Sequence, residues 1–189
     1  MRVDIITLFP ELVTGPMAVS ILGRAQERGL VTIRAVNPRD FTEDRYRTVD
    51  DRPYGGGAGM VMKPGPLFAA VESVRTAEST VVLMSPQGRV LRQPVVERLA
   101  QENHLIVICG HYEGVDERVR QELPDLEISI GDYVLTNGNV AAWVLVDEVV
   151  RLVPGVVNTP ESVVSESFSD PERLDFPHYT RPPEFRGMR

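Results

Sequence analysis

Three glycine-bearing segments, each following an apolar run, carry the residues of this chain that could bind a small ligand. They comprise residues 83–89, 109–118 and 129–139. Small residues leave backbone amides and carbonyls accessible, and open α/β sheets bind cofactors at loops that follow the carboxyl ends of strands. The segments therefore predict one cofactor site built from three loops. Residues 129–139 alone are equally consistent with a plain strand-to-helix connection.

Other residue patterns argue against several common chemistries. The three histidines lack metal-ligand spacing, and Ser85 lacks the glycine context of a nucleophile elbow. The glycines of residues 55–59 are followed by Met60 where a phosphate-binding Walker loop needs lysine. The single cysteine, Cys109, ends an apolar run and is expected to be a packed, inert thiol.

Alternating strand and helix patterns must position the three loops. Strands are predicted at residues 3–8, 31–36, 80–84, 105–109 and 126–130, and helices at residues 16–28, 66–76, 93–101, 114–122 and 139–152. This alternation predicts an α/β fold with a mainly parallel sheet covered on both faces. Residues 37–63 interrupt the pattern with charges, Pro53 and several glycines, so they are expected to form a functional loop.

Composition limits the class of protein. A chain of 189 residues that is 42% hydrophobic and 25% charged predicts one main domain with a sizeable core. We find neither a membrane-length apolar run nor a signal peptide, which favours a cytoplasmic protein with no membrane partner. The net charge of −7 has the wrong sign for indiscriminate binding to nucleic acid, so any such contact must be local. Arginines at 39, 45, 47 and 52, and at 173, 181, 186 and 189, could form such patches.

Segments typical of one bacterial family occur in order along nearly the whole chain. Besides the three loops, they comprise residues 6–10, 38–42, 47–57 and 177–182. On these residues the chain resembles the tRNA (guanine-N1)-methyltransferase family TrmD, of the SPOUT superfamily. The resemblance implies a deep trefoil knot in the α/β domain, which periodicity could not indicate because knots are nearly absent from proteins.

The resemblance also implies a division of the chain. Residues 1–155 correspond to the SPOUT methyltransferase domain, residues 156–172 to an interdomain linker, and residues 173–189 to the start of a C-terminal tRNA-binding domain. Family members continue into a basic helical domain, so most of that domain is expected to be missing here. Either the sequence is truncated or it is a natural short relative.

The family's activity implies a transferase that uses S-adenosyl-L-methionine to methylate N1 of guanine in tRNA, at the position 3′ of the anticodon. The partners implied are tRNA and a second copy of the chain, because in the family the linker orders over the active site of the partner subunit. Family members have also been associated with Mg²⁺ dependence. The sequence shows no dedicated cation cage, which leaves a metal requirement open.

The family's cofactor site corresponds to twelve residues of the three loops: Leu83, Ser85, Pro86, Gly110, Tyr112, Glu113, Gly114, Ile130, Gly131, Tyr133, Leu135 and Gly138. Glycines allow the backbone to approach an adenosine, and the aliphatic residues supply apolar walls for its base. Glu113 is a suitable neighbour for a sulfonium cation. Asp50, Arg52 and Gly59 are expected to contact the target nucleotide or to support the pocket.

Catalysis needs two further groups, because N1 of guanine carries a proton and charge moves to O6 as the methyl group is attacked. The resemblance assigns these roles to Glu166 and Arg151, on different halves of a composite site in a homodimer. Glu166 stands where the family has an aspartate. It adds a methylene, and a displacement of about 1 Å can cost roughly 10²-fold in rate.

The third loop departs from the family pattern. Family members have two glycines followed by Glu-Leu-Pro, whereas this chain has Asn137, Gly138, Asn139, Val140 and Ala141. Asparagine tolerates a positive φ, so the turn is expected to survive at Asn137. Loss of the family proline at Ala141 removes a constraint on the helix start, so cofactor affinity is expected to depend on this change.

Two alternatives remain open. The first is a catalytically weak or silent S-adenosylmethionine-binding module that acts as a dimeric RNA-interaction protein. The second is another nucleotide-binding α/β enzyme. Tight S-adenosylmethionine binding without methyl transfer would support the first, and a preference for ATP or a dinucleotide would support the second.

Overall fold

The computed structural model describes residues 1–157, 166–170 and 174–188, and the chain divides into two units, Met1–Val157 and Asn158–Arg189. The predicted linker therefore lies largely outside the described residues, as do Arg173 and Arg189. The predicted three-part division of the chain stays a prediction.

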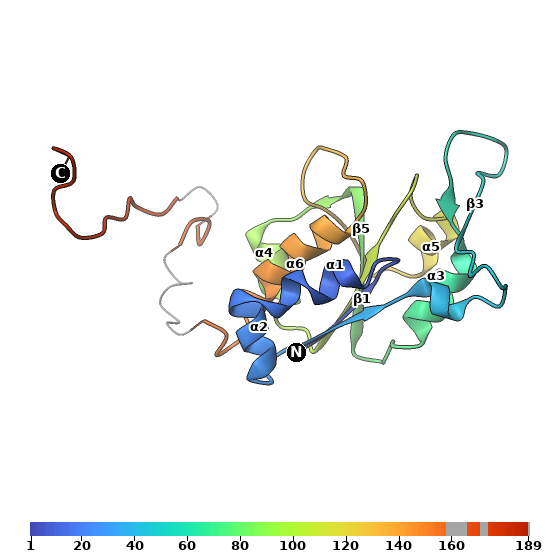
Figure 1. Cartoon of the computed structure of the whole chain (residues 1–189), viewed down its shortest axis with the longest axis horizontal. Helices are drawn as coiled ribbons and strands as arrows, with labels where there is room; N and C mark the ends of the chain where they lie inside the picture. The colour runs from blue at the N-terminus through green and yellow to red at the C-terminus, as the bar shows by residue number, and fades with distance from the viewer. Residues whose placement is uncertain (158–165, 171–173, 189) are drawn as a thin grey trace. The chain divides into compact units, whose positions relative to one another are not determined.

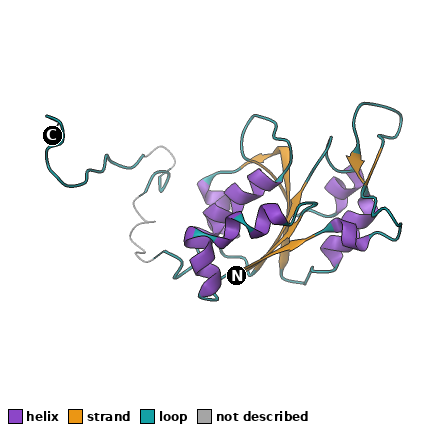
Figure 2. Ribbon diagram, in the orientation of Figure 1, coloured by secondary structure: helices purple, strands orange, loops and turns teal. Residues whose placement is uncertain are grey.

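Five parallel strands form the sheet of the first unit (Figures 1 and 2). Their order is β2-β1-β6-β5-β7, with β1 at Arg2–Ile6, β2 at Thr32–Val36, β5 at Ser79–Val90, β6 at His104–Cys109 and β7 at Leu126–Ser129. A separate antiparallel pair joins β3 (Asp50–Asp51) to β4 (Val61–Met62). The α/β class with a parallel sheet is thus confirmed.

Helices cover both faces of this sheet (Figures 1 and 2). The elements α1 (Glu11–Thr14), α2 (Ser20–Glu27), α4 (Gln93–Leu99) and α6 (Asn139–Arg151) pack on one face, and α3 (Pro64–Glu72) and α5 (Glu117–Glu122) pack on the other. No helix in the described part of the chain has both the length and the apolar character needed to cross a membrane.

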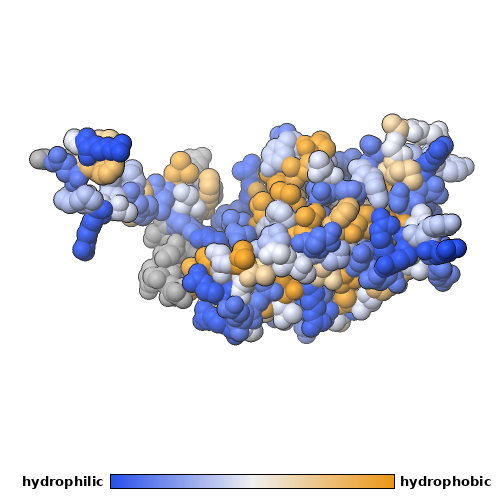
Figure 3. Space-filling model, in the orientation of Figure 1, coloured by the Kyte–Doolittle hydropathy of each residue, from blue (hydrophilic) through white to orange (hydrophobic). Residues whose placement is uncertain are grey.

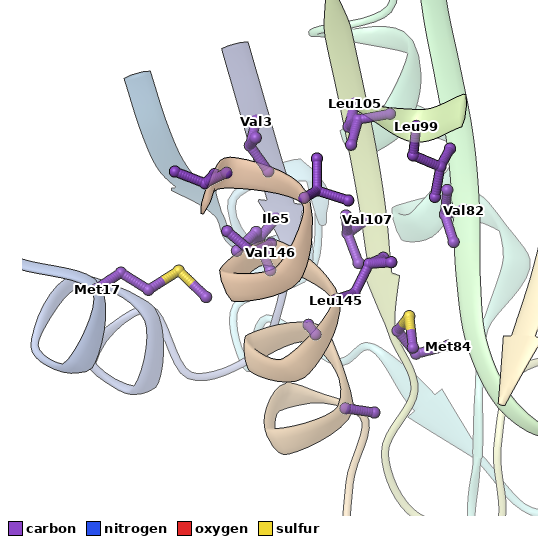
Figure 4. Packing of buried hydrophobic residues seen from close by; sticks show 14 of the residues in the cluster. Val3, Ile5, Met17, Val82, Met84, Leu99, Leu105, Val107, Leu145 and Val146 are labelled. Carbon is purple, nitrogen blue, oxygen red and sulfur yellow. The ribbon is translucent and has the colours of Figure 1, made fainter. Parts of the chain in front are cut away.

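Strand alternation divides the core into two apolar clusters. On β6, Leu105 and Val107 pack in one cluster, whereas Ile106 and Ile108 pack in the other, because successive side chains of a strand point to opposite faces. Figure 4 shows the first cluster, in which Val107 lies near Leu145 of α6. Burying each such side chain contributes about 1.5–3 kcal/mol.

The helix predicted at residues 16–28 is broken in two. A 3₁₀ helix spans Pro16–Ala18, Val19 is extended, and α2 begins at Ser20. A Cβ atom on Gly23 would lie only 2.3 Å from the carbonyl oxygen of Ala18. The break thus rests on a close backbone contact at a glycine, which helical periodicity does not reveal.

A buried polar cluster joins the amino ends of three neighbouring strands. Asp4 is fully buried, and its Oδ2 lies 2.7 Å from Nε2 of His104 and 2.6 Å from Nε of Arg2. The Nδ1 atom of His104 lies 2.7 Å from Oγ of Ser79. Because Asp4 accepts from Nε2, the imidazole places its proton there and can accept from the Ser79 hydroxyl at Nδ1.

We expect Asp4→Asn to lower the free energy of unfolding by about 1–3 kcal/mol, because the buried arginine and histidine contacts lose their carboxylate. The matched control is Asp40→Asn, which removes an exposed carboxylate paired with Arg47 and should cost less than about 1 kcal/mol. Urea unfolding measures both values. Equal losses for the two variants would show that the buried cluster is not stabilising.

Candidate active site

A cavity of about 260 Å³ opens beside the middle of β5 and the carboxyl ends of β6 and β7. Its walls come from the three glycine-bearing loops identified in the sequence. All twelve residues predicted for the cofactor lie in these walls: Leu83, Ser85, Pro86, Gly110, Tyr112, Glu113, Gly114, Ile130, Gly131, Tyr133, Leu135 and Gly138. The fold therefore brings together groups that are up to 55 positions apart in the sequence.

The first loop is an excursion inside a long strand. Met84 and Arg89 both pair with Ile128, so residues 85–88 leave the β5–β7 ladder and return to the same partner. A Cβ atom on Gly88 would lie 2.5 Å from the backbone nitrogen of Ile128. Glycine is thus required where the chain returns beside β7, and β5 extends well beyond the predicted strand.

The second loop turns tightly through residues 110–116. Tyr112 has a φ of 61°, an uncommon left-handed conformation for a residue with a side chain. The loop is stabilised by the Gly114 amide, which donates to the His111 carbonyl at 3.1 Å. The His111 ring packs edge-on against Tyr112, with ring centres 4.6 Å apart, and lies 5.1 Å from the ring of Phe9.

The third loop passes close to the end of β6. The Gly138 amide donates to the Gly110 carbonyl at 2.8 Å, and a Cβ atom on Gly138 would lie 2.9 Å from the Cα of Cys109. The Cys109 side chain is buried, and burial raises the pKa of its thiol far above the ordinary value. An uncharged, enclosed thiol is a poor nucleophile, in agreement with the prediction that Cys109 is inert.

The third loop does not have the positive φ that was predicted at Asn137. Positive φ in this loop falls on Gly131, at 154°, and not on Asn137. Instead, Oδ1 of Asn137 accepts a hydrogen bond at 2.9 Å from the backbone amide of Asn139, the first residue of α6. The helix start is thus stabilised by a side-chain acceptor, which asparagine provides and glycine cannot.

Acidic side chains outnumber basic ones around the cavity. The described lining includes three carboxylates, of Glu113, Glu117 and Glu127, and one guanidinium, that of Arg120. Arg120 donates to both oxygens of Glu127 at 3.0 Å and to Glu117 at 2.8 Å, and these contacts raise its pKa. Among the residues that the structure describes, Arg120 supplies the one guanidinium in the lining, and it is already paired with two carboxylates. The cavity therefore suits a cationic ligand better than an anionic one.

Sequence reasoning missed this ion network. Glu117 and Arg120 lie three positions apart on α5, a spacing that pairs charges on a helix, so this contact could have been predicted. Glu127 lies on β7, and its contact with Arg120 depends on how the helix packs against the sheet. Nothing local in the sequence indicates that contact.

The hairpin of β3 and β4 lies beside the second loop. The Glu113 amide donates to the Met60 carbonyl at 3.0 Å, and the Met62 amide donates to the Gly114 carbonyl at 3.0 Å. A Cβ atom on Gly59 would lie 2.5 Å from the Glu113 side chain. Of the three residues predicted to bind substrate, Gly59 thus touches a cavity residue.

Asp50 lies on β3, and Arg52 directly follows that strand. Asp50 pairs with Met62, whereas the side chain of Arg52 is exposed to solvent. Neither residue lines the cavity. Their contact with a substrate stays a prediction.

Arg151, one of the two residues predicted to be catalytic, does not line the cavity. Arg151 ends α6, and at 1.5 Å per residue its Cα lies about 18 Å along the helix from Asn139, next to the cavity. Glu166 is half-buried in the second unit, where its carbonyl accepts from the Ser169 amide at 3.2 Å. One chain alone therefore does not bring Arg151 to its own cavity.

Comparison with known proteins agrees with the resemblance found in the sequence. A family model described as tRNA (Guanine-1)-methyltransferase TrmD matches residues 1–189. The chain belongs to this family. A curated tRNA (guanine-N(1)-)-methyltransferase from Dictyoglomus turgidum is 57% identical over 189 residues, which cover all of this chain and 76% of that protein.

Two further members of the family show the same extent of similarity. The tRNA (guanine-N(1)-)-methyltransferase of Carboxydothermus hydrogenoformans is 56% identical over all of this chain and 74% of its own length. That of Gloeobacter violaceus is also 56% identical, over all of this chain and 84% of its own length. The similarity thus includes the cavity loops, the hairpin and the segment that contains Glu166.

Proposed function

We propose that this chain transfers a methyl group from S-adenosylmethionine to N1 of guanine in tRNA, at the nucleotide 3′ of the anticodon. Its location in the cytoplasm, where tRNA substrates occur, is part of the proposal. The observation that carries it is the acidic, glycine-lined cavity, in which the residues corresponding to the family's cofactor site meet. The curated relatives carry the name of the enzyme, so a catalytically silent module is not favoured.

The cavity residues fit such a cofactor. Gly131 and Gly138 keep the backbone open where a Cβ atom would meet Tyr133 or Cys109, and Leu83 and Ile130 supply apolar wall. When bound, S-adenosylmethionine supplies an electrophilic methyl group on a positively charged sulfur. The side chain of Glu113 provides a negative charge at this wall for the sulfonium.

In the proposed reaction, the Glu166 carboxylate removes the proton from N1 of guanine, and the nitrogen lone pair forms the bond to the methyl carbon. Bound S-adenosylmethionine would supply this methyl group, and its sulfur would keep the electron pair of the carbon–sulfur bond. Arg151 donates to the guanine O6, where negative charge develops. Mg²⁺ is not part of this proposal. Within the described residues, no group of three or more His, Cys, Asp or Glu side chains is arranged to hold a metal ion.

A second copy of the chain completes the proposed site. Apolar side chains gather along α6 and the loop before it (Figure 3), where Val134, Val140 and Val144 are exposed. Such a face is typical of an interface between subunits. The distance between Arg151 and the cavity of its own chain supports the same arrangement.

Complementation tests the composite site. A Glu113→Lys chain has a damaged cavity and an intact Glu166, and a Glu166→Ala chain has the reverse. If Glu166 acts on the partner's cavity, an equal mixture of refolded or co-expressed chains should regain about one quarter of wild-type activity, because half of the dimers contain one intact site. Mixtures as inactive as the separate variants would show that each chain uses its own Glu166.

The enzyme itself is tested by methyl transfer from labelled S-adenosylmethionine to unmodified tRNA with G 3′ of the anticodon. The control is the same tRNA with that G replaced, and calorimetry measures cofactor binding on the same sample. Transfer that disappears with the replacement supports the proposal. Binding without transfer would favour the silent module, and no binding would overturn the assignment of the cavity.

Gly59→Ala should weaken S-adenosylmethionine binding by roughly tenfold, because the new methyl group displaces the Glu113 side chain from the cavity wall. Gly55→Ala is the matched control. Gly55 also has a positive φ, at 88° compared with 76° for Gly59, but its Cβ atom would meet nothing within 4 Å. Calorimetry separates displacement of Glu113 from backbone strain, and equal losses of affinity would exclude a role for Glu113.

A further inference from the structure

A chain of buried and partly buried hydrogen bonds joins the end of β1 to the start of α6. Thr7, directly after β1, is fully buried, and Asn139 is 2% exposed. The Thr7 hydroxyl donates to Oδ1 of Asn139 at 2.7 Å and accepts from the Phe9 amide at 3.0 Å. Thr7 and Asn139 lie 132 positions apart in the sequence, so their hydrogen bond connects the end of β1 to α6.

The other end of the Asn139 amide holds the third cavity loop. Its Nδ2 donates to Oδ1 of Asn137 at 3.0 Å, and that oxygen also accepts from the Asn139 backbone amide. A backbone N–H is only a donor, so the Asn137 oxygen must face it. The side-chain Nδ2 of Asn139 must then point toward Asn137. The side-chain Oδ1 of Asn139 must point toward the Thr7 hydroxyl. All the donors in this chain of contacts therefore meet acceptors.

The residues that follow β1 also contact the second cavity loop. Phe9, whose amide donates to Thr7, packs against the ring of His111, and His111 packs against Tyr112. His111, Tyr112, Asn137 and Gly138 all line the cavity, whereas Asn139 does not. Asn139 thus stands behind the cavity wall, at a point from which it can fix the shape of that wall without touching a ligand.

We propose that Asn139 is a positioning residue for cofactor binding, which preforms the third loop through Thr7 and Asn137. The inference rests on the proposed function for the identity of the ligand, S-adenosylmethionine. The side chains at 137 and 139 belong to the loop segment in which this chain departs from the expected family pattern. They form the hydrogen bonds that fix the loop and the helix start together.

Asn139→Asp is the most discriminating variant. The carboxylate can still accept from Thr7, but it cannot donate to the Asn137 oxygen and repels it. We expect the dissociation constant of S-adenosylmethionine to rise about tenfold, as for loss of one buried hydrogen bond. The KM for the cofactor should rise in parallel, while kcat at saturating cofactor stays close to wild type, because the reacting groups are unchanged.

Thr7→Val should cause a similar loss of affinity, and Thr7→Ser should retain wild-type affinity because it keeps the hydroxyl. The surface control is Asn103→Asp, where an exposed side chain donates to Glu78 at 3.5 Å. A second readout needs no ligand. The Gly138 amide, bonded to Gly110, should exchange its hydrogen faster in Asn139→Asp than in wild type.

Variants with a lower unfolding temperature but wild-type affinity and wild-type exchange at Gly138 would overturn the inference, because Asn139 would then only support the helix. A wild-type chain that binds no S-adenosylmethionine would instead overturn the proposed function. In that case exchange at Gly138 alone decides the inference: faster exchange in Asn139→Asp supports it, and unchanged exchange refutes it.

Discussion

Replacing Gly138 with alanine is expected to reduce methyl transfer by two or more orders of magnitude. The added methyl group would lie 2.9 Å from both the Cα of Cys109 and the backbone nitrogen of Gly110. These are backbone atoms at the end of a central strand, so they cannot move aside as a flexible side chain could. The loop must shift instead, and a displacement of about 1 Å at a reacting site can cost roughly 10²-fold in rate.

Gly110→Ala is the matched control for this prediction. Gly110 also lines the cavity, but its Cβ atom would make an ordinary contact of 3.8 Å with Val115. The overpacked Gly138→Ala should also lose about 1–3 kcal/mol in the free energy of unfolding. Steady-state kinetics and urea unfolding of both variants decide the matter. Equal kcat/KM values for the two variants would show that the close passage at Gly138 does not shape the site.

The strands were predictable because a parallel sheet buried on both faces needs near-continuous apolar runs, such as residues 105–109. The interruptions of these elements could not be predicted from the apolar pattern. The kink before Ser20 and the excursion of residues 85–88 both depend on a glycine that meets distant or neighbouring backbone, at Gly23 and Gly88. Periodicity records which face of an element is buried, but it holds no information on such contacts.

The cavity loops were predictable for a different reason. Glycines and small residues after strands indicate a ligand site at one edge of a sheet, and the resemblance to the family selected which residues belong to it. The role of Asn137 was misread, since its side chain accepts hydrogen bonds while its φ stays ordinary. Local propensity could not identify Thr7 as the residue that donates a hydrogen bond to Asn139, because the two are far apart in the sequence.

Glu166→Ala is expected to lower kcat by about 10²–10⁴-fold, the usual contribution of a general base, while S-adenosylmethionine affinity stays within about twofold of wild type. The proposed cofactor cavity is formed by the first unit, whereas Glu166 belongs to the second. Single-turnover methyl transfer at saturating tRNA measures the chemical step, and calorimetry measures the affinity. Asp170→Ala, which removes another carboxylate from the same described segment, should leave both unchanged.

Two conservative variants separate base catalysis from other roles of the side chain. Glu166→Gln keeps the size but cannot take up a proton, so it should be as inactive as Glu166→Ala. Glu166→Asp restores the family's carboxylate and should retain activity to within about an order of magnitude, because the basic group remains. A Glu166→Gln chain with wild-type kcat would assign the proton to a different acceptor, and the cavity would then have to be completed by another group.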